Sequence, residues 1–127
     1  MTRLALETLR QAEEAVRPGI TGRELYDATC DLFEAAGWAT QRTTGAEARP
    51  DGFQHSLGHG VGLDVHEAPP LGLAGHEPLV TGDVVAIEPG LTDSQVGTVI
   101  FEDLVLVTEG GHEVLTRFPY DLSPAQG

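Results

Sequence analysis

The histidines of this 127-residue chain are unevenly spread, and their spacing is the first sign of chemistry. Four of the five fall within one short stretch: His55, His59, His66 and His76. Glycines on both sides of His59 allow backbone to approach closely, as a metal or substrate cavity requires. His59 and His66 are seven residues apart, so they converge only if a kink or bulge interrupts the strand. Two interpretations stay open here, a metal or substrate site and a glycine-rich surface loop.

Two glutamates favour the metal site. Glu88 directly follows four apolar residues, 84–87, and Glu102 follows the apolar residues 99–101. A carboxylate in an apolar strand is costly unless it is paired or coordinated. With a glycine-framed imidazole, two such carboxylates suit a divalent Mn, Fe, Co or Zn ion. The alternative interpretation is that each glutamate faces solvent. This alternative is weak for Glu88, because four apolar residues precede it, and stronger for Glu102, because Glu102 and Asp103 could form a solvated acidic pair.

The first third of the chain must supply helices. Apolar residues recur with the 3.6-residue period over residues 3–16, which predicts an amphipathic helix. Thr21 and Glu24 fit a capping box that begins a second helix, and Gly37 closes it. Cys30 lies in this second helix, and we expect it to be a small buried hydrophobe rather than a nucleophile. The polar segment 40–52 is predicted to be a surface loop.

The second half reads as strands. Strands are predicted at 61–65, 79–80, 84–87, 99–107 and 113–116, and turn residues separate them. Pro69 and Pro70 should stop the strand predicted at 61–65. Pro89-Gly90 should end the strand predicted at 84–87 and fix the Glu88 carboxylate at the rim of that strand. Residues 119–127 are expected to form a tail. Helices followed by strands predict an α+β fold with two helices packed on a mainly antiparallel sheet.

Composition excludes several functions. The chain has 20 acidic residues against seven arginines and no lysine, which gives a net charge of −13. A Schiff-base lysine and a lysine-bearing phosphate loop are therefore excluded, and nucleic acid is an unfavourable partner. No apolar stretch is long enough to span a membrane. With one cysteine and no recognisable signal peptide, we expect a cytoplasmic protein.

Three segments resemble one family. The segments GHGVGLDVHE (58–67), AIEPG (86–90) and FEDLVLVT (101–108) are similar to the creatinase/prolidase/methionine aminopeptidase family, which has the pita-bread fold. The segment RPGITGRE (17–24) resembles the helices of the same family. The similarity covers nearly the whole chain in the family's order, and LDVHE resembles the Xaa-Pro dipeptidase and aminopeptidase P branch. The resemblance implies one partial pita-bread peptidase domain over residues 1–127, with a curved sheet, truncated at its N-terminus.

The resemblance also implies a role for each candidate residue. His59 would be the imidazole ligand of a two-metal site, Glu88 a second ligand and general base, and Glu102 a bridging carboxylate. His66 would contact the scissile carbonyl, and His55 would shape the pocket. The substrate would be a peptide or dipeptide with proline at the second position. His76 and His112 match no role in this family.

Two departures from the family pattern change the expectation. The family's two aspartate ligands precede the first helix, and this sequence starts just before that helix. We therefore expect one weakly bound divalent ion or none, little or no cleavage of Xaa-Pro dipeptides, and self-association as a homodimer. A non-catalytic pseudoenzyme that binds a peptide or partner, or an assembly domain, is the alternative. Ile100 stands where many relatives carry an arginine.

Overall fold

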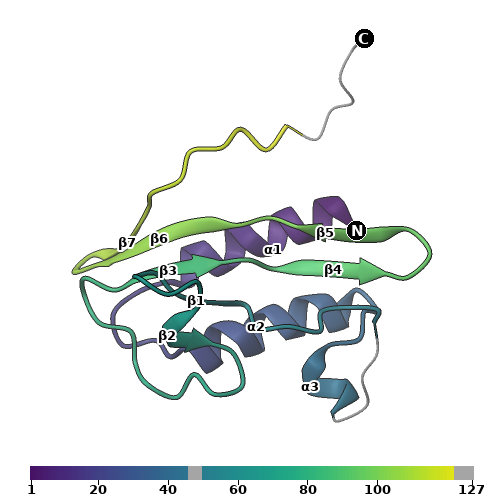
Figure 1. Cartoon of the computed structure of the whole chain (residues 1–127), viewed down its shortest axis with the longest axis horizontal. Helices are drawn as coiled ribbons and strands as arrows, with labels where there is room; N and C mark the ends of the chain where they lie inside the picture. Colours follow the sequence, from purple (N-terminus) through teal and green to yellow (C-terminus); the bar gives the residue numbers. More distant parts are fainter. Residues whose placement is uncertain (46–49, 122–127) are drawn as a thin grey trace.

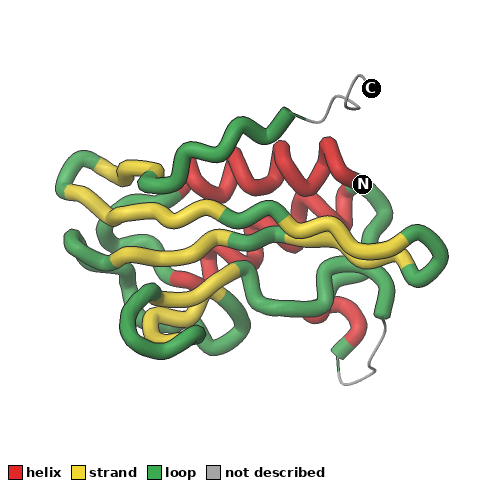
Figure 2. Tube along the Cα trace, turned by 45° about the horizontal axis from the view of Figure 1, so that its top comes forward, coloured by secondary structure: helices red, strands yellow, loops and turns green. Residues whose placement is uncertain are grey.

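Two long helices pack on one face of an antiparallel sheet. The computed structural model describes residues 1–45 and 50–121. Helix α1 spans Thr2–Ala15 and α2 spans Gly22–Ala35, and both run alongside the strands (Figures 1 and 2). The predicted capping box is present, because the Thr21 hydroxyl accepts from the Glu24 amide at 3.1 Å and Glu24 accepts from the Thr21 amide at 2.8 Å. The two predicted helices are confirmed.

All strands pair antiparallel. The main sheet has the order β2-β1-β3-β6-β7, and β4 and β5 form a separate hairpin (Figure 1). The bounds are β1 Gly58–Gly60, β2 Glu67–Leu71, β3 Val84–Ile87, β4 Gly90–Asp93, β5 Gly97–Ile100, β6 Asp103–Thr108 and β7 Gly111–Val114. The predicted α+β class is therefore confirmed.

Several predicted elements differ from the structure. Residues 61–65 form an exposed loop between β1 and β2 instead of a strand, and residues 79–80 lie outside the strands. The two prolines lie inside β2, where an edge position tolerates the missing N–H donors. The predicted strand 99–107 is interrupted between β5 and β6, and after Glu88 the chain continues into β4.

A short helix occupies part of the segment predicted to be a loop. Helix α3 spans Gln41–Thr44. The backbone N–H of Thr40 donates a hydrogen bond to the Thr43 hydroxyl at 3.1 Å. The rest of the predicted loop includes residues 46–49, which lie outside the described residues, as do residues 122–127 of the predicted tail. Within the described ranges, no helix is long and apolar enough to cross a membrane.

The core lies between the helices and the sheet. Phe53 packs against two aromatic rings of α2, with ring centroids 5.8 Å from Tyr26 and 5.2 Å from Phe33. All three side chains are fully buried. Cys30 is also fully buried, which confirms its expected place in the core. Phe53 directly precedes the segment with the histidines, so this aromatic cluster anchors the start of that segment.

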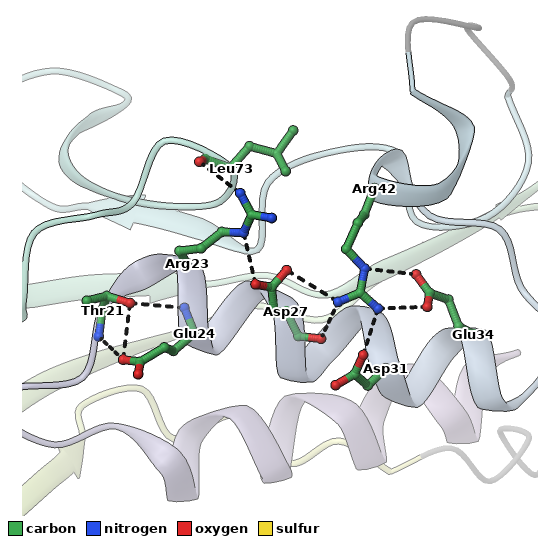
Figure 3. A network of polar contacts seen from close by, with 8 residues as sticks. All are labelled: Thr21, Arg23, Glu24, Asp27, Asp31, Glu34, Arg42 and Leu73. Atoms are coloured by element: carbon green, nitrogen blue, oxygen red, sulfur yellow. Dashed lines mark hydrogen bonds and ion pairs between the residues drawn. The ribbon is translucent and has the colours of Figure 1, made fainter.

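An arginine attaches α3 to α2 (Figure 3). The Arg42 guanidinium lies 3.3 Å from Asp27, 2.6 Å from Asp31 and 2.7 Å from Glu34, all on α2. Asp27 is also paired with Arg23 at 2.9 Å. The hydrogen bonds that Arg42 donates to Glu34 and Asp31 raise the pKa of Arg42, and they lower the pKa of Glu34. The network therefore holds α3, which precedes the histidine segment in the sequence, against α2.

We expect Arg42→Ala to lower the free energy of unfolding by about 1–2 kcal/mol, because three carboxylates of α2 lose a shared cation. Urea denaturation measures the change, and Arg3→Ala, which removes an exposed arginine of α1, is the matched control. Part of the loss should disappear at about 1 M salt, where exposed ion pairs are screened. Equal stabilities of the two variants would contradict this account of Arg42.

Candidate metal centre

His59 and His66 meet because the chain reverses between β1 and β2. The two strands pair antiparallel, with Gly60 opposite Glu67 and a register shift between Gly58 and Gly60. The imidazole rings lie edge to face with centroids 4.6 Å apart. His59 and His66 therefore converge, and the strand irregularity that this requires lies at Gly58 and Gly60.

The glycines beside His59 are required by close backbone packing. A Cβ atom at Gly58 would lie 1.8 Å from the Ala86 carbonyl oxygen on β3. A Cβ atom at Gly60 would lie 2.0 Å from the Ala68 carbonyl oxygen on β2. Real side chains do not approach carbonyl oxygens so closely, so only glycine fits on either side of His59. This confirms that the glycines serve close backbone approach.

His59 has one ring nitrogen free for a ligand. Its Nδ1 lies 2.8 Å from the Gly60 carbonyl oxygen, which can only accept, so Nδ1 carries the proton. In the neutral ring this leaves the lone pair of Nε2 available to a ligand, and Nε2 lies 3.6 Å from Oε1 of Glu88. A hydrogen bond at one ring nitrogen is the usual arrangement when the other nitrogen binds a metal.

Three side chains could share one ion. Donor atoms of His59, His66 and Glu88 all lie within 4.8 Å of one another. Two donors bound to one ion at about 2.1 Å each lie no more than about 4.2 Å apart, so small side-chain movements would suffice. His59 and Glu88 are half-buried, whereas His66 is exposed. The nitrogen and carboxylate donors fit a borderline divalent ion.

Glu102 lies outside this group of three and is exposed. Its backbone carbonyl accepts the Tyr120 hydroxyl at 2.6 Å. The strand register nevertheless relates it to Glu88. Ile87 pairs with Asp103 and Gly90 with Ile100, so the same register continued between them sets Glu102 opposite Glu88. Residues directly opposite in antiparallel strands share a face, with Cβ atoms about 5 Å apart.

A cavity of about 680 Å³ adjoins the three side chains, and six of the residues that line it are His55, His59, His66, Glu67, Glu88 and Ile100. His55 is held by its Nδ1 atom 2.7 Å from the Ser56 carbonyl oxygen and by its ring against Phe53. His76 is exposed, and His112 contacts the Val16 carbonyl oxygen at 3.1 Å. Neither is among the residues that line the cavity.

Sequence reasoning missed Glu67. Its half-buried carboxylate lines the cavity and accepts from the Asp64 amide at 3.1 Å. A Cβ atom at Gly62 would lie 2.2 Å from Glu67 Oε1, so the carboxylate lies directly against the loop backbone. Glu67 therefore holds the loop that carries His66. Glu67 directly follows His66 in the sequence, but no sequence pattern indicates that its carboxylate contacts the backbone of its own loop.

A buried pair of acids lies beside Glu102. Asp103 on β6 and Glu13 on α1 are 1% and 4% exposed. Burial, and then the hydrogen bond and charge of Asp103, raise the pKa of Glu13 to about 7, against a smaller opposing effect of Arg10. Asp103 accepts hydroxyl hydrogen bonds from Thr116 and Tyr120. Burial and then Asp103 raise the pKa of Tyr120 to about 12.

This pair predicts a pH-dependent stability. Glu13 has its ordinary pKa of about 4.5 when unfolded, so between pH 4.5 and 7 the folded state binds the extra proton. Its stabilising contribution is complete below pH 4.5 and is lost as the pH rises through 7. We expect Glu13→Gln to raise the free energy of unfolding at pH 8 by about 2 kcal/mol and to flatten its pH dependence.

Urea denaturation between pH 5 and pH 8 measures this effect. Glu14→Gln removes an exposed neighbouring charge on α1 and is the matched control. A Glu13→Gln variant whose pH dependence equals that of the unmodified chain would contradict the raised pKa of Glu13.

Comparison with known proteins gives one consistent family. The model of metallopeptidase family M24 matches residues 1–109. The chain is 37% identical over 119 residues to an Xaa-Pro dipeptidase of Pyrococcus furiosus, covering 94% of this chain and 31% of that protein. It is 38% identical over 120 residues to a putative dipeptidase of Bacillus subtilis, covering 91% and 30%. The chain thus spans about a third of the length of these relatives.

Solved structures agree with the sequence comparisons. The prolidase of Pyrococcus horikoshii superimposes with a TM-score of 0.84 at 34% identity, covering 97% of this chain and 32% of that one. The Xaa-Pro dipeptidase of Bacillus anthracis gives a TM-score of 0.80 at 35% identity, covering 95% and 31%. The helices and the sheet described above are therefore similar to one part of each of these larger structures.

Proposed function

Because this chain belongs to metallopeptidase family M24, we propose that its cavity is part of a metal-dependent site that hydrolyses peptides with proline at the second position. The observation that carries the proposal is the approach of donor atoms of His59, His66 and Glu88 to within 4.8 Å of one another. The names of the relatives, Xaa-Pro dipeptidases and prolidase, support the substrate class.

The ligand set in this proposal uses His59 through Nε2 and Glu88 through its carboxylate. Glu102, opposite Glu88 in the register, would add a second carboxylate after a side-chain rotation. These nitrogen and oxygen donors fit Mn, Co, Zn or Fe, and manganese is the ion we propose first. A divalent ion bound there would polarise a peptide carbonyl and favour ionisation of a water molecule.

The remaining residues of the site would handle the substrate and its protons. Glu88 would accept a proton from the attacking water. His66, at the exposed side of the same group, would donate a hydrogen bond to the oxygen of the scissile carbonyl. His55 would form a wall of the substrate cavity. Proton transfer by such groups contributes about 10²–10⁴-fold to a rate, so it supports the proposed chemistry without replacing the ion.

We propose further that the 127-residue chain by itself binds one ion and hydrolyses Xaa-Pro peptides slowly. Within the described residues there is one group of three candidate donors, and two of its members, His59 and Glu88, would hold the ion together with Glu102. Cooperation of two ions would require further ligands. The non-catalytic alternative shares the same cavity and differs only in that peptide binds without being cleaved.

Metal titration and a peptidase assay test the proposal together. Calorimetry with Mn²⁺ on chelator-treated protein is expected to give one ion per chain. Xaa-Pro dipeptides and Xaa-Pro-Xaa tripeptides, incubated with excess Mn²⁺, should be cleaved slowly by the unmodified chain and not by His59→Ala. Binding of metal and peptide without cleavage would support the non-catalytic alternative. Absence of metal binding, or cleavage that His59→Ala retains, would contradict the proposed site.

A homodimer is also part of the proposal. Among the described residues, four large apolar side chains are at least two-thirds exposed: Leu63 fully, Val65 at 83%, Val96 at 78% and Phe118 at 67%. Contact between two copies would remove such surface from water. Sedimentation velocity at several concentrations should show a dimer that dissociates on dilution, and a monomer at every concentration would contradict it. The cytoplasmic location stays a prediction from the sequence.

A further inference from the structure

The segment that follows β7 returns to the backbone of Glu102. After β7 ends at Val114, residues 115–121 lie outside the strands, and the Tyr120 hydroxyl donates to the Glu102 carbonyl oxygen at 2.6 Å. The same hydroxyl lies 3.0 Å from Oδ1 of Asp103. Its single proton is therefore shared between acceptors on two consecutive residues, at the point where the chain enters β6.

The Tyr120 hydroxyl takes the place of a strand amide at Glu102. Leu104 turns its backbone groups toward β7, because its carbonyl accepts from the Leu115 amide at 2.8 Å and its N–H donates to the Thr116 hydroxyl at 3.1 Å. Backbone groups alternate in direction along a strand, so the Glu102 carbonyl points to the same side. Strand β7 pairs only with residues 105–108 of β6, and its ladder ends before Glu102. The Glu102 carbonyl therefore receives a side-chain hydroxyl instead of a backbone N–H.

Packing orients the ring that carries this hydroxyl. The Tyr120 ring centroid lies 5.0 Å from that of Phe101 in an edge-to-face contact and 5.3 Å from that of Phe118. The guanidinium carbon of Arg10, on α1, lies 5.4 Å from the centre of the Tyr120 ring. Aromatic pairs and cation–π contacts of this kind favour particular ring orientations. The hydroxyl is thus directed at the Glu102 carbonyl by contacts that do not involve the Glu102 side chain.

We infer that Tyr120 is a positioning residue for Glu102, whose backbone it fixes so that the Glu102 carboxylate can reach the proposed ion. This inference deepens the proposed function and rests on it. Consecutive side chains in extended backbone point to opposite faces, and Asp103 is 1% exposed whereas Glu102 is exposed on the face of Glu88. With its backbone fixed, Glu102 needs only a side-chain rotation to reach the ion. A loose backbone would add the entropy cost of ordering the main chain to that of ordering the side chain.

A double-mutant cycle measures whether Tyr120 acts through Glu102. Tyr120→Phe keeps the ring and removes the hydroxyl, and we expect it to weaken Mn²⁺ binding about tenfold, as loss of outer-shell support typically does. Glu102→Gln removes the carboxylate charge on which Tyr120 is inferred to act. In the Glu102→Gln background, Tyr120→Phe should therefore change the Mn²⁺ affinity less than about twofold. A general loss of structure would instead weaken binding by the same factor in both backgrounds.

Two measurements on the purified 127-residue chain test the inference: calorimetry with Mn²⁺, and the ¹³C NMR signal of the Glu102 carbonyl in the metal-free protein. Tyr26→Phe is the matched control, because Tyr26 is fully buried on α2 and its hydroxyl has no hydrogen-bond partner among the described residues. The Glu102 carbonyl signal should move in Tyr120→Phe, which loses a hydrogen bond to that oxygen, and stay in place in Tyr26→Phe. The Mn²⁺ affinity of Tyr26→Phe should lie within about twofold of that of the unmodified chain.

The outcomes separate this inference from the proposed function. A Glu102 carbonyl signal that Tyr120→Phe leaves unchanged would overturn the inference, whatever the ion does. A moved signal with unaltered Mn²⁺ affinity, or with the same loss of affinity in both backgrounds of the cycle, would overturn the positioning role and leave the metal centre in place. Absence of Mn²⁺ binding by the unmodified chain would overturn the proposed function and the inference together.

Discussion

Replacing His59 with alanine is expected to weaken binding of a divalent ion by at least about a hundredfold. The His59 Nδ1 atom is held by the Gly60 carbonyl at 2.8 Å, so Nε2 is oriented toward Glu88 before any ion binds. Loss of outer-shell support alone typically weakens metal binding about 10–100-fold, and loss of the ligand itself should cost at least as much. Calorimetry with Mn²⁺ measures the change.

His76→Ala is the matched control for this variant, because His76 is exposed and does not line the cavity. Circular dichroism should show the same folded spectrum for both variants. Glu88→Gln should also weaken binding, since it removes the carboxylate charge while it keeps the shape of the side chain. Equal Mn²⁺ affinities for His59→Ala and His76→Ala would show that the ion binds somewhere else.

Replacing Gly58 with alanine should destabilise the chain by about 3 kcal/mol and remove metal binding at the same time. The added Cβ atom would lie 1.8 Å from the Ala86 carbonyl oxygen, and β1 and β3 would have to separate. Overpacking in a core typically costs about 1–3 kcal/mol, and a clash between two backbones cannot be relieved by a side-chain rotation. Displacing β1 also displaces His59.

Urea denaturation and Mn²⁺ calorimetry measure the two effects of Gly58→Ala. Gly110→Ala is the matched control, because a Cβ atom there would meet no atom within 4 Å. Gly110 lies in the turn before β7, so this variant leaves β1 untouched. A Gly58→Ala chain as stable as Gly110→Ala would contradict the close approach of β1 to β3.

The helices could be predicted because their signals are local. A 3.6-residue apolar period and the Thr21–Glu24 capping box both operate within a few residues. The sequence pattern wrongly predicts a strand at residues 61–65, because Val61, Leu63 and Val65 alternate with polar or small residues. In the structure these side chains are exposed and the pairing is made by the flanking segments. Pattern alone does not reveal which neighbouring segment has a partner strand.

The site could be predicted only in part. The apolar residues before Glu88 predict it as a candidate ligand, but the approach of His66 to His59 depends on a register shift that no single residue specifies. The contact of Glu13 with Asp103 joins positions 90 residues apart, and Glu13 alone looks like one more charge on an amphipathic helix. Such contacts arise from tertiary packing and have no local sequence signal.

Coordination of an ion by His59 Nε2 is tested most directly by proton NMR of the Co²⁺-loaded chain. The Nδ1 proton, held by the Gly60 carbonyl, should give a strongly shifted signal that exchanges in D₂O. That signal should be absent from His59→Ala and present in His76→Ala. A spectrum without a shifted exchangeable signal, or one that keeps the same signal in His59→Ala, would contradict the proposed metal centre.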